Sequence, residues 1–124
     1  MKSIDFGSFI LEFESHFIKL ILKHEAHFDG EKFENSYNLK STIYGDKKIG
    51  VLIERRDPNA TYSFDPLILL NNLEVLESQV RWVVVVSEKA LDYSHLEFVS
   101  EMTKLKCMAV RTCEEAKQWV AENF

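Results

Sequence analysis

A run of four valines most constrains what this chain can fold into. Val83 to Val86 follow Trp82, and β-branched side chains have few rotamers and suit a buried, pleated surface. A second run, Ile49 to Ile53, contains no polar side chain. Apolar runs without alternation are typical of central parallel strands that are covered on both faces. The two runs therefore predict the middle of a parallel sheet with helices packed against it.

Two earlier segments and one later segment add strands to this sheet. Residues 8–14 and 17–23 alternate with period two, which predicts strands. The link between them is short, so an antiparallel hairpin is expected. Residues 107–110 form a short apolar run near the end of the chain. The sequence therefore predicts five strands.

Four helices are expected between and after these strands. Asp29 suits the N-cap of a first helix that ends at Gly45. Asp65 and Pro66 suit the N-cap and first turn of a second helix, whose leucines recur at helical spacing. Residues 88–104 predict a third helix, and Thr112 with Glu115 forms a capping box for the last one. The predicted order is ββαβαβαβα in a single domain, residues 1–124.

Composition excludes several classes of function. The chain has 124 residues and a net charge of -5, and its fifteen lysines and arginines are scattered. This balance favours neither nucleic acid nor an anionic membrane surface. No apolar run approaches the roughly 20 residues of a membrane helix, and the N-terminus lacks a signal-peptide pattern. Two cysteines are expected to be reduced thiols, so we expect a soluble cytoplasmic protein.

The usual catalytic and cofactor motifs are missing from the sequence. Its four glycines are isolated, so neither dinucleotide nor P-loop fingerprints occur, and there is no GxSxG nucleophile elbow. His24, Glu25 and His27 could collect a metal, but a structural zinc site needs four ligands, so we expect a solvated segment and no metal. Cys107 should be a small buried hydrophobe. Cys113 begins a helix and is the only plausible nucleophile. We expect no cofactor and no enzymatic activity.

The candidate site lies beyond the carboxyl ends of the strands, where open α/β sheets bind ligands. Arg55, Arg56 and Arg111 follow three strands, and Ser63 lies nearby at the start of the second helix. Guanidinium groups and helix N–H groups would suit a phosphate or carboxylate. In the alternative, structural interpretation, one arginine pairs with Asp57 or Asp65 and holds the loop closed.

Three residues of the same loop have two interpretations each. Ser63 could accept a phosphate or hydrogen-bond the start of the helix. Tyr62 and Phe64 could be exposed anchors for a partner protein, or one of them could staple the loop to the core. The candidate binding residues are therefore Arg55, Arg56, Tyr62, Ser63, Phe64 and Arg111.

The segments Val51 to Arg56, Asn59 to Pro66, Trp82 to Val86 and Glu114 to Trp119 resemble the small stand-alone STAS/SpoIIAA-like proteins of bacteria. The resemblance covers nearly the whole chain and is most specific in the Tyr-Ser-x-Asp-Pro segment. It implies a five-stranded mixed α/β sheet with helices mainly on one face. It also implies a regulatory module that binds another protein and is switched by phosphorylation, with Ser63 near the acceptor position. In the family the phosphoacceptor typically lies in an Asp-Ser-Ser/Thr-Gly segment, whereas here Ser63 is followed by Asp65 and Pro66 and no glycine.

Two function hypotheses result. In the first, a regulatory interaction module meets a partner protein or a small anionic ligand through the loop after the central strand. In the second, by fold-level analogy to CRAL-TRIO modules, the protein carries a lipid or small ligand in a pocket between helices and sheet. Any surplus of exposed aromatic side chains in the first helix and hairpin would mark a face for a partner or for a homodimer.

Overall fold

The computed structural model describes residues 2–23, 27–55, 63–64 and 66–124. Its strands are β1 (Lys2–Asp5), β2 (Phe9–Phe13), β3 (Phe17–Leu22), β4 (His27–Phe28), β5 (Ile49–Glu54), β6 (Ser63–Phe64), β7 (Val80–Val86) and β8 (Lys106–Val110). Its helices are α1 (Gly30–Tyr44), α2 (Pro66–Gln79), α3 (Ala90–Met102) and α4 (Cys113–Asn123). Asp65, the predicted N-cap of α2, lies outside the described residues, but the helix begins at Pro66 as predicted.

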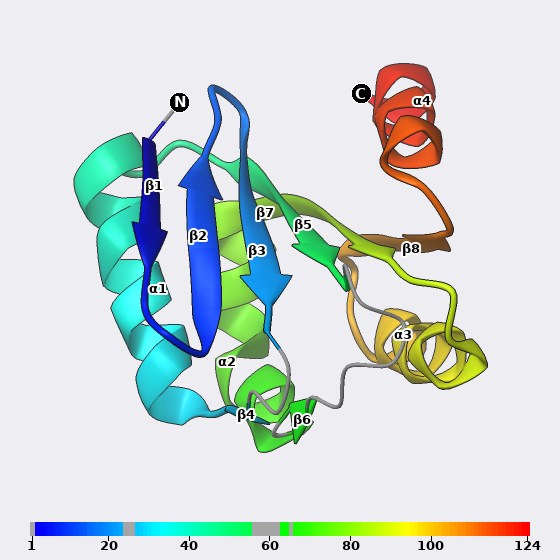
Figure 1. Ribbon diagram of the computed structural model, residues 1–124, viewed down its shortest axis with the longest axis horizontal. Coiled ribbons are helices and arrows are strands. Elements are labelled where there is room, and N and C mark those ends of the chain that lie inside the picture. The colour runs from blue at the N-terminus through cyan, green and yellow to red at the C-terminus, as the bar shows by residue number, and fades with distance from the viewer. Residues whose placement is uncertain (1, 24–26, 56–62, 65) are drawn as a thin grey trace.

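The main sheet has six strands in the order β1-β2-β3-β5-β7-β8, as Figure 1 shows. Strands β1, β2 and β3 are antiparallel, whereas β3, β5, β7 and β8 run parallel. The predicted hairpin, the central position of β5 and β7 and the mixed sheet are confirmed. The prediction of five strands was wrong, because Lys2–Asp5 adds an edge strand. All four of its residues are exposed, so no burial pattern in the sequence marks it.

Three helices cover one face of the sheet and α4 covers part of the other. Inward side chains of β2, β3 and β5 form one core with α1, and this core includes Leu11, Leu20 and Phe33. Trp82, Val84 and Ala116 belong to the second core, between the sheet and α4. Figure 1 shows α3 and α4 on opposite sides of β8. The expectation of helices mainly on one face is therefore confirmed.

Local signals determine where the helices begin and end. The Asp29 carboxylate accepts a hydrogen bond from the Lys32 N–H at 3.1 Å, and this contact lowers the pKa of Asp29. Gly45 ends α1 with φ of 62°, a conformation that favours glycine. The Thr112 hydroxyl accepts from the Glu115 N–H at 3.1 Å and caps α4. These three caps match the sequence predictions.

Gly50 has a packing role that its isolation in the sequence does not reveal. It lies opposite Trp82 in the parallel pair β5–β7. A β-carbon at position 50 would come within 2.0 Å of the Trp82 ring. The indole therefore lies directly over the glycine, and any larger residue would have to displace it.

Candidate functional site

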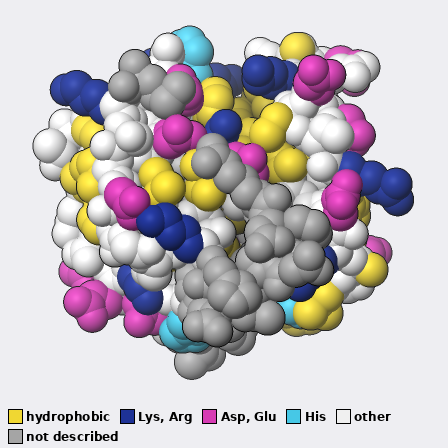
Figure 2. Space-filling model, in the orientation of Figure 1, with side chains coloured by type: hydrophobic (Ala, Val, Ile, Leu, Met, Phe, Trp, Pro, Cys, Tyr) yellow, Lys and Arg dark blue, Asp and Glu magenta, His cyan; other side chains and the backbone are white. Residues whose placement is uncertain are grey.

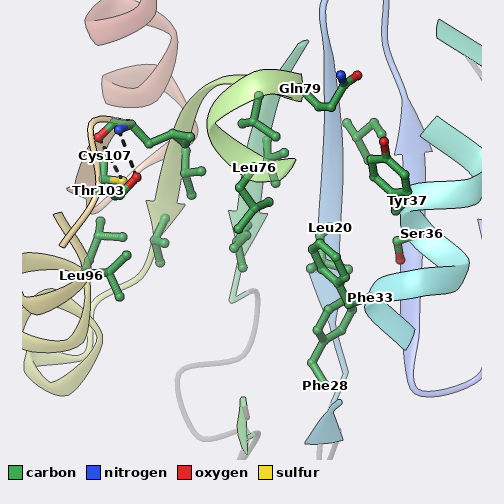
Figure 3. A pocket seen from close by; sticks show the side chains of 18 of the residues that line it. Leu20, Phe28, Phe33, Ser36, Tyr37, Leu76, Gln79, Leu96, Thr103 and Cys107 are labelled. Carbon is green, nitrogen blue, oxygen red and sulfur yellow. Dashed lines mark hydrogen bonds between the residues drawn. The ribbon is translucent and has the colours of Figure 1, made fainter. Parts of the chain in front are cut away.

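An apolar pocket lies between the sheet and helices α1, α2 and α3. Its volume is about 480 Å³, within the range of roughly 300–1,000 Å³ typical of small-molecule sites. Leu20 and Val83 form part of its floor, and Phe33, Leu76 and Leu96 come from the three helices. In Figure 3, Leu76 of α2 lies between Leu96 on the α3 side and Phe33 on the α1 side. The pocket exists because the helices do not pack closely enough to fill the space above the sheet.

A few polar groups interrupt the apolar wall. Ser36 and Tyr37 lie on the α1 side, and Thr103 and Cys107 lie on the α3 side (Figure 3). The Ser36 hydroxyl donates to the Lys32 carbonyl of its own helix, and the Thr103 hydroxyl donates to Glu77 at 3.0 Å. Most of the wall thus offers hydrophobic contact, and a small number of groups can orient a ligand.

Lys40 is the charged group of α1 that lines this pocket. The residue is only 5% exposed, although lysine is almost never fully buried without a partner. Its Nζ donates to the Gly45 carbonyl at 2.8 Å and to Gln79 Oε1 at 2.6 Å. Both acceptors are neutral oxygens. Desolvation lowers the pKa of Lys40, while the negative charge of Asp46 acts in the opposite direction.

Cys107 lies in the same pocket and behaves as a buried thiol. Burial raises its pKa to about 11, and its Sγ lies 3.6 Å from the Leu105 carbonyl oxygen. Both cysteines are free. A thiol with so high a pKa is a poor nucleophile near neutral pH. This agrees with the prediction that Cys107 acts as a small hydrophobe.

The carboxyl edge of the sheet, where sequence patterns placed the site, holds a buried ion pair. Arg55 Nε and Nη2 donate to the two carboxylate oxygens of Asp92 at 2.9 and 3.2 Å. The Ser87 hydroxyl donates to the same carboxylate at 2.5 Å. The side chains of Arg55 and Asp92 are only 5% and 9% exposed. Arg55 is therefore engaged in holding the start of α3 against the end of β5.

The other predicted site residues are only partly described. Arg56 and Tyr62 lie outside the described residues, as do Asp57 and Asp65, the predicted arginine partners. Ser63 and Phe64 form β6 and pair in parallel with His27 and Phe28 of β4. Arg111 is exposed between β8 and α4. The candidate roles of Ser63 as phosphoacceptor and of Tyr62 and Phe64 as anchors remain predictions.

The described ranges contain no cluster of three or more His, Cys, Asp or Glu residues able to hold a metal. His24 and Glu25, two members of the potential metal group, lie outside them. Within these ranges, too, no helix has the length and apolar character to cross a membrane. On the face in Figure 2, acidic and basic side chains are interspersed around apolar ones.

Sequence reasoning missed the two charged residues that matter most here, Lys40 and Asp92. A signal for Lys40 was present, because Phe33, Tyr37, Lys40 and Tyr44 recur at helical spacing and share one face of α1. Asp92 lies in the first turn of α3. Acidic side chains are common there because they interact favourably with the helix dipole, so the position alone does not indicate a special role. Its pairing with Arg55 depends on tertiary structure alone.

Comparison with known proteins identifies the class of fold. No protein-family model matches the sequence, and no curated relative matches it. Among solved structures, the chain is similar to an uncharacterised protein of the DUF3478 family with a SpoIIAA-like fold, from Shewanella loihica PV-4. The two chains are 15% identical, the match covers 90% of each, and the TM-score is 0.58. At this identity the likeness establishes the fold alone. The protein has a SpoIIAA-like fold, as the sequence resemblance implied.

Proposed function

We propose that this protein binds and carries an apolar or amphipathic small molecule in the pocket between the sheet and helices α1, α2 and α3. The observation that carries the proposal is the pocket itself, about 480 Å³ with walls formed mainly by Leu, Ile, Val and Phe side chains. Water gains few hydrogen bonds at such a wall, and an apolar ligand gains from leaving water. Burial of each methylene group contributes about 0.8 kcal/mol.

The alternative function, a regulatory module that meets a partner through the loop around Arg55 to Pro66, has less support. The Arg55 guanidinium is buried against Asp92 and is not presented to an anionic ligand. The candidate residues Arg56 and Tyr62 are outside the described residues. A pull-down with wild type and with the double variant Arg56→Ala, Tyr62→Ala tests this alternative. Identical partner sets would exclude the loop as the recognition surface.

Native mass spectrometry of the purified protein tests the carrier proposal. We expect a population whose mass exceeds that of the chain by one small molecule, and we expect organic extraction to remove it. The extracted protein should then bind decan-1-ol with a rise in melting temperature, since a ligand that binds only the folded state stabilises it. A protein that retains nothing and does not respond to decan-1-ol would overturn the proposal.

A pair of substitutions on α1 locates the binding site. Ser36 lines the pocket, and among the described residues its hydroxyl bonds only within the helix, so Ser36→Phe should fill the cavity without removing a tertiary hydrogen bond seen there. Thr42 is exposed on the same helix and donates to the Asn38 carbonyl in the same way. Thr42→Phe is therefore the matched control. Ser36→Phe should weaken decan-1-ol binding at least tenfold, whereas Thr42→Phe should leave it unchanged.

A further inference from the structure

The ammonium group of Lys40 is a buried cation at the wall of an apolar pocket. Lysine carries three N–H donors, and two of them meet the neutral oxygens of Gly45 and Gln79. No carboxylate lies within ion-pair distance of Lys40 in the described ranges. Asp46 acts on it through charge alone and is itself exposed. One donor and the net positive charge are therefore left for another group.

Burial of an uncompensated charge is costly, and proteins normally avoid it or pair the charge. A surface lysine would carry its ammonium into water at little cost. Here the side chain instead lies under the end of α2, where Gln79 orients it at 2.6 Å. Among the described residues no anion pairs with this ammonium, and a molecule bound in the adjoining apolar space could supply one.

Tyr37 adds a second polar group at the same place. It lies one turn before Lys40 on α1, and both residues line the pocket. Figure 3 shows the Tyr37 side chain beside the cavity, with Gln79 above it. The Tyr37 hydroxyl has no hydrogen-bond partner within the described part of the chain, and it can therefore donate to a ligand in the pocket.

We propose that the ligand is a long-chain carboxylate whose headgroup binds the Lys40 ammonium while its hydrocarbon tail lies in the pocket between the sheet and the helices. This inference rests on the proposed function and names the chemical class of its ligand. A single ammonium beside two neutral oxygen acceptors matches a monoanion. A phosphate dianion would face the Gly45 and Gln79 oxygens without a second cation.

Calorimetric titration with decanoate and decan-1-ol tests the inference, since the two ligands share a chain and differ in the headgroup. Wild type should bind decanoate about tenfold or more tightly than the alcohol, as expected for a charge-assisted hydrogen bond. Lys40→Met should weaken decanoate binding by about the same factor and should change decan-1-ol binding far less, because the alcohol has no charge for the ammonium to pair with. Lys47→Met removes an exposed lysine just beyond α1 and should change neither affinity.

The outcomes separate this inference from the proposed function. If wild type binds both ligands equally, or if Lys40→Met binds decanoate as tightly as wild type, the assignment of a carboxylate headgroup to Lys40 is wrong. The proposal that the pocket carries an apolar ligand is then unaffected. If neither ligand binds wild type, both proposals fall. The comparison of decanoate with decan-1-ol on wild type requires no variant, so it decides the question even if Lys40→Met does not fold.

Discussion

Arg55 and Asp92, 37 positions apart in the chain, form a bidentate ion pair that is almost completely buried. The pair joins the end of β5 to the first turn of α3. Ser87, which follows β7, donates to the same carboxylate, and the Tyr93 hydroxyl donates to the Ser87 carbonyl at 3.0 Å. Two strand ends and a helix start are therefore connected through one carboxylate, at the edge where the sequence predicted a binding site.

Neutralising Asp92 should destabilise the fold strongly. Asp92→Asn keeps the shape of the side chain but removes the charge with which the buried Arg55 guanidinium pairs, and breaking a buried ion pair costs about 3–5 kcal/mol. Urea unfolding measures the loss. Glu97→Gln, an exposed charge change on the same helix, is the control and should shift the free energy of unfolding by less than about 0.5 kcal/mol. Equal effects of the two variants would show that the ion pair contributes nothing.

Adding a methyl group at Gly50 should disturb the second core. The new β-carbon would meet Trp82 Cε2 at 2.0 Å, so the indole must move, and overpacking of this kind costs about 1–3 kcal/mol. Gly30→Ala is the matched control, because no atom lies within 4 Å of a β-carbon there. Chemical unfolding should show a loss only at position 50. In a Gly50→Ala background, Trp82→Leu should recover part of it, and an additive loss would contradict this explanation.

Alkylation of Cys107 should be slow near neutral pH and should accelerate with pH. In a Cys113→Ser background, the rate with iodoacetamide should rise about tenfold per pH unit until it levels off near pH 11. In denaturant the same rate should level off near the ordinary thiol pKa of about 8.5. Because the folded pKa is raised, the contribution of this thiol to stability is present below the ordinary pKa and is lost as the pH rises towards 11. A plateau near pH 8.5 in the folded protein would contradict the burial of the thiol.

Lys40 should lower the stability of the empty protein at neutral pH. Its folded pKa lies below the ordinary value of 10.5, so the unfolded chain holds this proton more tightly than the folded protein does. The resulting penalty is present at neutral pH and disappears as the pH rises through the lowered pKa towards 10.5. The free energy of unfolding of Lys40→Met at pH 7 should therefore equal that of wild type or exceed it by up to about 1 kcal/mol. The difference between the two should change in favour of wild type as the pH rises, as measured by urea unfolding.

A clear loss of stability in Lys40→Met at pH 7 would show that the bonds to Gly45 and Gln79 outweigh the desolvation of the ammonium. Lys47→Met again provides the control, since that lysine is exposed and should show no such pH dependence relative to wild type.

The sheet could be predicted from sequence wherever burial left a continuous apolar run or an alternating pattern. The valines of β7 and the apolar run of β5 lie at its centre, and the alternation of β2 and β3 marked the hairpin. Strand β1 could not be found in this way, because its pairing with β2 depends on backbone hydrogen bonds and its side chains stay exposed. The helix caps at Asp29, Gly45 and Thr112 were predictable because each depends on residues within one turn.

The candidate site was less predictable, since it depends on how closely helices approach the sheet. The sequence of α3 shows apolar residues at Leu91, Phe98 and Met102, yet these are 62%, 65% and 41% exposed. Asp92 of the same helix pairs with Arg55, a contact between residues far apart in the chain. No sequence motif marks a cavity, because a cavity is the volume that side chains leave unfilled. The polar residues of the predicted loop lie in a recognisable sequence motif, whereas Lys40 lies within an ordinary amphipathic helix.

Among the described residues, the sheet separates the tryptophans from a tyrosine that lines the pocket. Both tryptophans, Trp82 and Trp119, belong to the core on the α4 side, whereas Tyr37 lines the pocket on the opposite face. Tryptophan emission will therefore report unfolding of the α4 side. It will change little when a molecule enters the pocket. A tryptophan placed at Leu76 or Phe33 would give the pocket an optical signal of its own.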